Sequence, residues 1–388
     1  TTHAANLFAL KELGNIYTRI MNPTQDVLEK RMAALEGGAA ALALASGTSA
    51  IYYAIINICS AGDHVVSAAN LYGGTYTTFH DILPQFAIDV SLVEARADLI
   101  EAAVNERTRA IYVETIGNPA LDVIDLEAVG KVAERHHLPL VVDSTFTTPY
   151  LMRPFEHGAH VVCHSLTKWL GGHGAGIGGV VVDGGRFDWS DRRFKLFNEP
   201  DGSYHNLRWA HDLGGMNPVA FAVRLRLVPL RNLGACISPD NAWLFLQGIE
   251  TLPLRMQRHC DNALAVARHL EGHKKVGWVR YPGLASDPSH AVAKKYLKKG
   301  FGGMVVFGIK GDRPAGERFI NSLKLLSHLA NVGDATSLAI HPASTTHSQL
   351  SEADQRAAGA SPDLVRLSIG IEHVDDIIAD IDQALDKS

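Results

Sequence analysis

The strongest constraint on the fold is a regular alternation of short apolar runs and helical stretches between residues 40 and 143. Five runs, which we interpret as strands, are 40–45, 64–68, 88–93, 109–114 and 138–143. The helical stretches between them are 50–58, 73–82, 98–104 and 126–136. Short strands joined by helices of this length form a mainly parallel sheet that is covered on both faces, so we predict an α/β fold.

The rest of the chain continues the sheet and then adds a second region. The runs 160–164 and 179–183 are rich in β-formers and have no helix between them, and residues 187–215 form an irregular insertion. Helical stretches are expected at 218–233, 239–270, 290–297, 315–326 and 374–385, and strands at 278–280, 304–309 and 364–369. We place a boundary near Cys236, which gives a large domain 1–235 and a smaller α+β domain 236–388.

The chain of 388 residues is long enough for two domains, and its charge excludes several partners. A formal net charge of −5 argues against nucleic acid and against an anionic membrane surface. No apolar run approaches the roughly 20 residues that a membrane span needs, and no signal-peptide pattern is visible. The four cysteines are far apart in the sequence, which is typical of reduced thiols, so we expect a cytoplasmic protein.

A first helix is expected after residue 23, with Thr24 as its N-cap and Gly37 at its end. The strand 40–45 then runs into Ser46, Gly47 and Thr48 at the start of the next helix. Free N–H groups and the helix dipole meet at such a turn, which therefore suits an anion such as phosphate. An ordinary capped helix that binds nothing is the alternative.

Lys168 follows Ser165 and Thr167 directly after the strand 160–164, and a glycine-rich loop comes next. A lysine amine is a covalent catalyst when its pKa is lowered and its position is fixed. The stretch therefore suits a Schiff base between Lys168 and a carbonyl cofactor whose phosphate contacts the two hydroxyls. A surface lysine in a Ser/Thr turn is the alternative.

Two acids end neighbouring predicted strands, Glu114 before Asn118 and Asp143 before Thr145. In open α/β sheets, ligands bind at the carboxyl ends of the strands. An aspartate there can keep a pyridine nitrogen protonated, which makes the ring an electron sink. An aspartate that caps the next turn is the alternative for an isolated residue.

Arg366 stands in the apolar run 364–369, where a guanidinium requires a carboxylate partner. A substrate carboxylate and an internal salt bridge both meet that need.

The glycines at 174, 176 and 179 match G-x-G-x-x-G, but they run into a strand rather than opening a helix, so we reject a dinucleotide site. The histidines show no metal-ligand spacing, and we expect no metal.

Together these residues resemble the Cys/Met-metabolism family of pyridoxal-phosphate (PLP) enzymes, from about residue 6 to the end of the chain. The stretch Ser165-Leu166-Thr167-Lys168, preceded by the strand that ends at Asp143, is similar to the cofactor-lysine signature of that family. The resemblance implies an aspartate-aminotransferase-like fold (PLP fold type I) and PLP as the cofactor.

The resemblance also implies a role for individual residues. Lys168, Tyr72 and Asp143 would be catalytic, with Lys168 forming the Schiff base, Asp143 pairing with the ring nitrogen and Tyr72 stacking on the ring. The other implied cofactor contacts are Ser46, Gly47, Thr48, Ser165, Thr167, Thr145 and Asn118, with Tyr17 and Arg19 reaching the phosphate of a neighbouring subunit. The implied substrate contacts are Arg366, Ser337, Asn118 and Glu114.

Within the family, residues 337–347 and the insertion around 187–189 and 204–205 resemble the O-acetylhomoserine sulfhydrylase branch, although Asn206 stands where glycine is expected. The implied reaction of methionine biosynthesis is γ-replacement: sulfide or methanethiol displaces acetate from O-acetyl-L-homoserine, giving homocysteine or methionine. A homotetramer with active sites at dimer interfaces is also implied. Cystathionine γ-synthase and methionine γ-lyase are alternatives, although Gly74 replaces a cysteine usual in the lyases. A scaffold without catalysis is a further alternative, which the intact Lys168, Asp143 and Arg366 oppose.

Overall fold

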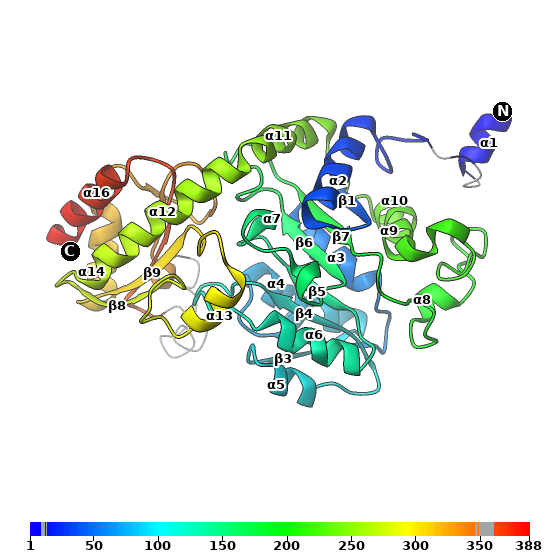
Figure 1. Ribbon diagram of the computed structural model, residues 1–388, viewed down its shortest axis with the longest axis horizontal. Coiled ribbons are helices and arrows are strands. Elements are labelled where there is room, and N and C mark those ends of the chain that lie inside the picture. Colours follow the sequence, from blue (N-terminus) through cyan, green and yellow to red (C-terminus); the bar gives the residue numbers. More distant parts are fainter. Residues whose placement is uncertain (9–11, 13, 346–347, 349–360) are drawn as a thin grey trace.

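The computed structural model describes residues 1–8, 12, 14–345, 348 and 361–388, and it contains two β-sheets (Figure 1). The strands of the first sheet are β1 (Ala40–Leu44), β2 (His64–Ala68), β3 (Asp89–Val93), β4 (Thr108–Glu114), β5 (Leu140–Asp143), β6 (Val161–Ser165) and β7 (Gly179–Asp183). Their order is β1-β7-β6-β5-β4-β2-β3, and β7 runs in the direction opposite to the other six strands. The predicted mainly parallel sheet is therefore confirmed.

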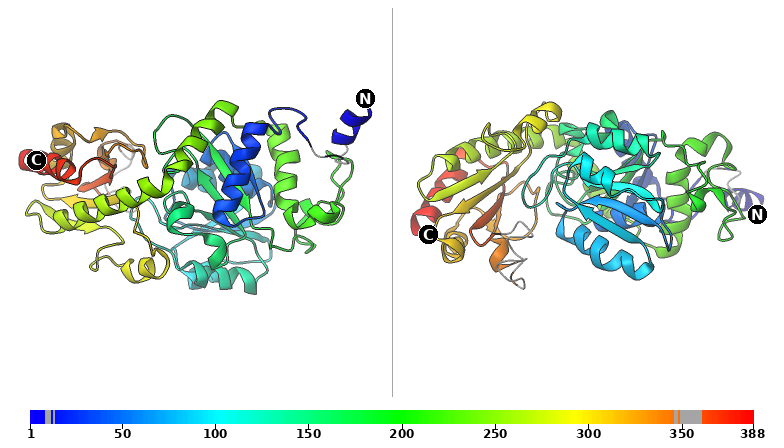
Figure 2. Two further views of the ribbon diagram at one scale, coloured as in Figure 1. Left: turned by 45° about the horizontal axis from the view of Figure 1, so that its top comes forward. Right: turned by 90° about the horizontal axis from the view of Figure 1, so that it is seen from below.

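Helices cover both faces of this sheet, as Figure 2 shows. The helices of its half of the chain are α1 (Thr2–Phe8), α2 (Pro23–Glu36), α3 (Gly47–Ile56), α4 (Gly73–Thr77), α5 (Ala97–Ala102), α6 (Leu126–Arg135), α7 (Thr148–Leu151), α8 (Lys195–Asn198), α9 (Ala220–Leu225) and α10 (Arg231–Leu233). Successive strand residues alternate between two buried clusters: Val142 packs in the cluster that contains Leu28 of α2, whereas Val141 packs in the one that contains Ile51 of α3. This alternation explains why the strands are apolar throughout rather than at every second residue.

Several predicted helix boundaries differ from the structure for local reasons. The N-cap of α2 is Asn22, whose side chain accepts a hydrogen bond from the Thr24 amide, so the predicted cap Thr24 is wrong. Helix α3 begins at Gly47 because Ser46 caps it. The stretch 73–82 divides into α4 and a π-helical turn (Thr78–Ile82), and 218–233 divides into α9, a π-helical turn (Arg226–Leu230) and α10.

The insertion 187–215 contains the short helix α8, and buried aromatic side chains hold it against the sheet. The ring of Trp189 stacks on Phe197 with centroids 4.4 Å apart and on Phe221 of α9 at 5.3 Å. His205 and Asn206 have φ values of 54° and 56°, in the left-handed region that glycine adopts most easily. The expectation of glycine at position 206 therefore reflects a real turn, which asparagine tolerates better than most residues.

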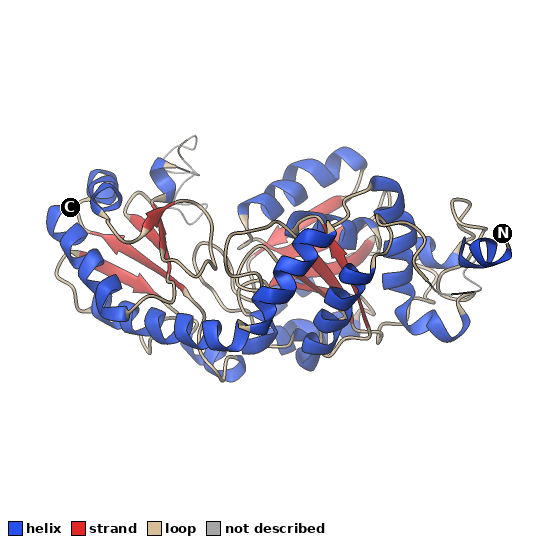
Figure 3. Ribbon diagram, turned by 90° about the horizontal axis from the view of Figure 1, so that it is seen from above, coloured by secondary structure: helices blue, strands red, loops and turns tan. Residues whose placement is uncertain are grey.

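The second sheet, in the order β10-β11-β12-β9-β8, lies apart from the first, with a long helix running from one to the other (Figure 3). Its strands are β8 (Val276–Arg280), β9 (Met304–Ile309), β10 (Ser327–His328), β11 (Leu338–Ile340) and β12 (Leu364–Ser368). The helices are α11 (Pro239–Glu250), α12 (Leu252–Glu271), α13 (His290–Tyr296), α14 (Asp312–Ser322) and α16 (Val374–Lys387). Strands β10 and β11 were not predicted, because runs of two and three residues carry almost no periodicity.

The long helical stretch 239–270 is interrupted at Thr251, so it forms α11 and α12 rather than one helix. Leu252 and Met256 of α12 pack with the core of the first sheet, whereas Val266 and Leu270 pack with the second. The domain boundary near Cys236 stays a prediction. Among the described residues, no helix combines the length and apolar character needed to cross a membrane.

Candidate active site

The predicted site residues gather at the carboxyl edge of the first sheet. Glu114 and Asp143 end β4 and β5 and are register partners, and Asp143 pairs in turn with Cys163 of β6. Ser165 ends β6, and Lys168 follows it in a tight turn. Parallel strands bring their carboxyl ends to one edge, which is why residues about 50 positions apart in the sequence share this place.

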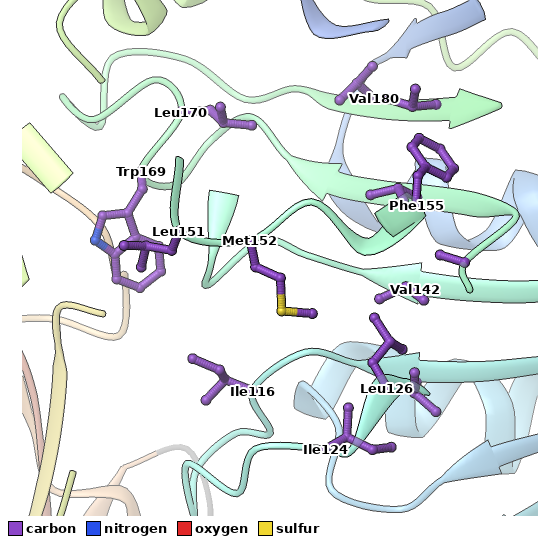
Figure 4. Close-up of a cluster of buried hydrophobic side chains, with 14 of the residues drawn as sticks. Ile116, Ile124, Leu126, Val142, Leu151, Met152, Phe155, Trp169, Leu170 and Val180 are labelled. Atoms are coloured by element: carbon purple, nitrogen blue, oxygen red, sulfur yellow. The ribbon is translucent and has the colours of Figure 1, made fainter. Parts of the chain in front are cut away.

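The turn that carries Lys168 is anchored on both sides of the lysine. The Gly172 amide donates to the Lys168 carbonyl at 2.7 Å, and the Leu166 amide donates to the Gly178 carbonyl at 2.9 Å. The next side chain, Trp169, is fully buried in the cluster drawn in Figure 4. Burial, and secondarily the positive charge of Arg366, lowers the pKa of Lys168 to about 8. The lysine therefore has the two properties that covalent catalysis requires.

Asp143 lies buried beside this turn and is tied to it through Thr145. The Thr145 amide donates to Asp143 Oδ1 at 2.8 Å, and Thr145 Oγ1 accepts from the Ser165 amide at 2.9 Å. Burial raises the pKa of Asp143, although the hydrogen bonds of Thr145 and the charge of His164 oppose the shift. Among the described residues Asp143 has no ion-pair partner, so a cationic ring nitrogen would compensate the charge of its carboxylate.

Glu114 is also buried, and its carboxylate accepts the Tyr72 amide at 2.8 Å. Burial first, and then the neighbouring Asp143, raises the pKa of Glu114 well above its usual range. Tyr72, at the N-terminal end of α4, is half exposed. Its ring lies over Gly74, where a Cβ would come within 2.6 Å of the ring. Glu114 therefore holds the segment that presents Tyr72.

The start of α3 and the end of β6 form the predicted anion site. A Cβ on Gly47 would lie 2.6 Å from the Ser165 Cβ, so only glycine lets the helix N-terminus approach the strand so closely. Ser46 Oγ caps α3 by accepting the Ser49 amide at 3.0 Å, and the first turn of the helix, with N–H groups that have no partner within the helix, lies against Ser165. Thr167 Oγ1 accepts the Gly178 amide at 3.1 Å. A phosphate fits here because N–H groups, a helix dipole and hydroxyls converge.

Arg366, on β12 of the second sheet, faces the same site from the other side. Its Nη1 donates to Asn118 Oδ1 at 3.2 Å and its Nη2 donates to the Ala330 carbonyl at 2.8 Å. No carboxylate of the described residues forms an ion pair with it, so the internal salt bridge is not formed within this part of the chain. Burial lowers the pKa of Arg366 to about 10. A guanidinium without an anion, beside the lysine, suits a substrate carboxylate.

Within the part of the chain that the structure describes, Ser337, Tyr17 and Arg19 make their contacts with residues other than Lys168. Ser337 is fully buried, and its hydroxyl donates to Glu372 at 2.9 Å and accepts the Gly370 amide at 2.8 Å. Tyr17 is 60% exposed, and the Arg19 guanidinium lies over its ring and bonds the Arg231 carbonyl. Thr346 and His347, in the stretch 337–347, lie outside the described residues.

The structure adds two residues that sequence reasoning missed. Lys168 Nζ donates a hydrogen bond to Asn331 Oδ1, and Arg255 of α12 donates to the Trp169 and Leu170 carbonyls at 2.7 and 3.3 Å. Neither contact leaves a local signal in the sequence. Asn331 is 163 positions from Lys168, and Arg255 is 86 positions from Trp169. Within the described residues, no group of three or more His, Cys, Asp or Glu side chains is arranged to hold a metal.

An aldehyde cofactor with a ring nitrogen and a phosphate fits the lysine, the buried aspartate and the anion site at once. The fold and site therefore define an aspartate-aminotransferase-like PLP enzyme. The chain belongs to the Cys/Met metabolism PLP-dependent enzyme family, whose model matches residues 1–386.

Individual relatives are similar over nearly their whole length. The chain is 54% identical to the O-acetyl-L-homoserine sulfhydrylase of Leptospira meyeri, covering 99% of this chain and 89% of that one. It is 50% identical to the homocysteine synthase of Schizosaccharomyces pombe, covering 99% and 90%. A crystal structure of a putative O-acetylhomoserine (thiol)-lyase from Campylobacter jejuni, which carries a pyridoxyl-lysine, has a TM-score of 0.95 and 42% identity, covering 99% and 91%.

The lowered pKa of Lys168 predicts how the apoprotein binds its cofactor. Because the neutral amine is the nucleophile, covalent capture of PLP should rise with pH around a midpoint near 8, not near the ordinary value of 10.5. Stopped-flow mixing at pH 6 to 10, followed by borohydride trapping, measures the rate, and Lys168→Ala is the control that should trap nothing. A midpoint above 10 would contradict the assignment.

The raised pKa of Glu114 predicts a pH-dependent effect of Glu114→Gln. The folded protein keeps this carboxyl protonated above the usual 4.5, so the wild type loses stability as pH rises above that value, whereas a neutral amide loses none. The melting temperature of the apoprotein variant minus that of wild type should therefore be larger at pH 8 than at pH 5. Exposed Glu106→Gln serves as the matched control, and an equal difference at both pH values would mean that Glu114 is ionised.

Proposed function

We propose that this protein catalyses γ-replacement on O-acetyl-L-homoserine, with sulfide as the acceptor and L-homocysteine and acetate as products. The observation that carries the proposal is Arg366, a guanidinium with no carboxylate partner among the described residues, placed beside a lysine of lowered pKa. The names of the relatives, at 50–54% identity, support the same substrate. Methanethiol is a second acceptor that the same chemistry accommodates.

Different residues would hold PLP and the amino-acid substrate. Lys168 would carry PLP, Asp143 would keep its ring nitrogen protonated, and the start of α3 with Ser165 and Thr167 would hold the phosphate. When bound, PLP supplies an electron sink that stabilises negative charge at the substrate Cα. Arg366 and Asn118 would hold the substrate carboxylate, which orients Cα toward Lys168.

The Lys168 amine, neutral in a useful fraction near pH 8, would take the Cα proton and, once it has given that proton up, a proton from Cβ. Cβ and Cα would each regain a proton after the sulfur has added, before the product leaves. The Cγ–O bond breaks and acetate leaves with the electron pair. The sulfur of hydrosulfide supplies the pair for the new Cγ–S bond, so charge and atoms balance. Tyr72, half exposed and fixed through its backbone by Glu114, is our candidate for proton transfer near the leaving group.

The acyl group is selected by charge. Among the predicted site residues, Arg366 is the one cation assigned to a substrate carboxylate, and none is assigned to a second carboxylate. An acetyl ester is neutral and needs no second cation. A succinyl ester brings a second carboxylate, which would lose its water without gaining a partner.

We therefore expect purified holoenzyme to make homocysteine from O-acetyl-L-homoserine and sulfide, and to use the O-succinyl ester at least about tenfold less well in kcat/KM, or about 1.4 kcal/mol. The measurement is kcat/KM for both esters at fixed sulfide, with Lys168→Ala as the inactive control. Equal values or a succinyl preference would assign the chain to cystathionine γ-synthase chemistry. Release of 2-oxobutyrate in place of homocysteine would assign it to the γ-lyases.

We further propose a homotetramer whose active sites lie at dimer interfaces. The proposal is supported by Tyr17, which is 60% exposed with Arg19 over its ring, and by large apolar side chains exposed on α2, α11 and α12. These include Val27, Trp243 and Leu254. Sedimentation should give a tetramer, and Arg19→Ala should weaken PLP binding by tenfold or more without unfolding the protein. A fully active monomer would contradict this assembly.

We place the protein in the cytoplasm and in methionine biosynthesis. All four cysteines are free, and three of them are buried, which suits a reducing compartment. The proposed product, homocysteine, lies one methyl transfer away from methionine. Cell fractionation tests the location, and rescue of a homocysteine-requiring strain tests the metabolic role.

A further inference from the structure

The loop 117–125, which follows β4, carries Asn118 to the site and is strained at one residue. The Gly117 amide donates to the Asp122 carbonyl at 2.9 Å, and the Leu121 amide donates to the Gly117 carbonyl at 3.1 Å. Leu121 is buried, and its φ of 60° lies in the left-handed region, where a leucine is strained. Such a conformation persists only where the surrounding structure imposes it, so the neighbours of the loop must hold it in place.

These neighbours belong to β8 and to the segment just before α13. Arg280 of β8 donates from Nη2 to Asp122 Oδ1 at 2.8 Å. The Val123 amide donates to Ser289 Oγ at 3.1 Å. The partners lie 158 and 166 positions away in the sequence, so the half of the chain that builds the second sheet holds a loop of the first.

A single buried carboxylate fixes both residues that hold the loop. Asp287, whose side chain is 0% exposed, accepts from Arg280 Nε at 3.0 Å. Its other oxygen accepts the Ser289 amide at 2.8 Å, and the Tyr281 amide donates to it at 3.0 Å. The guanidinium of Arg280 therefore has a fixed position and presents its free end to Asp122.

We propose that Arg280 is a positioning residue for the substrate, which holds the loop through its ion pair with Asp122 so that Asn118 meets Arg366. The inference deepens the proposed function and rests on it, because Asn118 and Arg366 are the groups proposed to hold the substrate carboxylate. Asn118 Oδ1 accepts from Arg366 Nη1 at 3.2 Å. A loop that could shift would spread Asn118 over many positions, and a small misplacement of a binding group is costly.

The lysine turn is held by other groups, which separates substrate binding from the chemistry of the amine. Trp169 is buried in the core of the first sheet, and Arg255 donates to its carbonyl at 2.7 Å. Loosening the loop should therefore weaken binding of the substrate carboxylate, whereas the pKa of Lys168 should stay at about 8.

The test uses Asp122→Ala in the holoenzyme, because Asp122 is half exposed and its loss leaves Arg280 paired with Asp287. The Kd of free glycine, read from the visible absorbance of bound PLP, should rise by about threefold to fivefold. KM for O-acetyl-L-homoserine should rise equally, with kcat changed less than about twofold. Asp212→Ala, which breaks the pair of Arg208 and Asp212 with the same 2.8 Å separation, is the matched control and should change neither.

Two further variants show whether the ion pair carries the effect. Asp122→Asn keeps an acceptor for the guanidinium and should recover part of the lost affinity. Arg280→Met should weaken glycine binding as Asp122→Ala does, and combining the two should weaken it no further, since both remove one interaction. Additive effects would overturn the proposal. If Arg280→Met does not fold, the two Asp122 variants decide the matter.

A purely structural role would lower the melting temperature of Asp122→Ala and leave the glycine Kd and the ester KM at wild-type values, which would also overturn the proposal. Glycine binding requires neither ester nor sulfide. A raised glycine Kd in a protein that makes no homocysteine would therefore contradict the proposed function while supporting the role of Arg280.

Discussion

The site depends on two cations, and neither of them has a carboxylate partner among the described residues. Lys168 and Arg366 come from different sheets, and burial together with the guanidinium charge makes the ammonium form of Lys168 costly. The same environment makes the amine a nucleophile near neutral pH and leaves the guanidinium ready for a carboxylate. The repulsion between the two cations thus keeps the Lys168 amine reactive, and the surrounding structure must hold the two groups in place against it.

The fold supplies that restraint from both sides. The parallel strands β4, β5 and β6 end together and place Glu114, Asp143 and Ser165 in one row. Trp169, buried in the core, fixes the lysine turn from within the first sheet. From the second sheet, the connection 329–337, which joins β10 to β11, and Arg255 of α12 bond the carbonyls of the same turn. The lysine turn is therefore held by both halves of the chain, which α12 joins in Figure 1.

Much of this arrangement was predictable, because its causes are local. The strands 64–68, 179–183 and 304–309 are confirmed residue for residue, since apolar runs between turn residues leave few alternatives. The anion site at Ser46 and Gly47 follows from a strand, a small-residue turn and a helix in sequence. Errors arose where local signals compete: Thr24 and Asn22 both suit an N-cap, and the fold chose Asn22.

The sequence by itself determined the mainly parallel sheet, the lysine turn and the edge at which the site lies, because periodicity and turn chemistry act between near neighbours. Only the tertiary structure decided which groups touch. It engaged the Ser337 hydroxyl with Glu372, left Arg366 without a carboxylate among the described residues, and brought Asn331 to Lys168 across 163 positions. Such contacts depend on how two sheets pack on one another, and no pattern within a short stretch of chain encodes that distance.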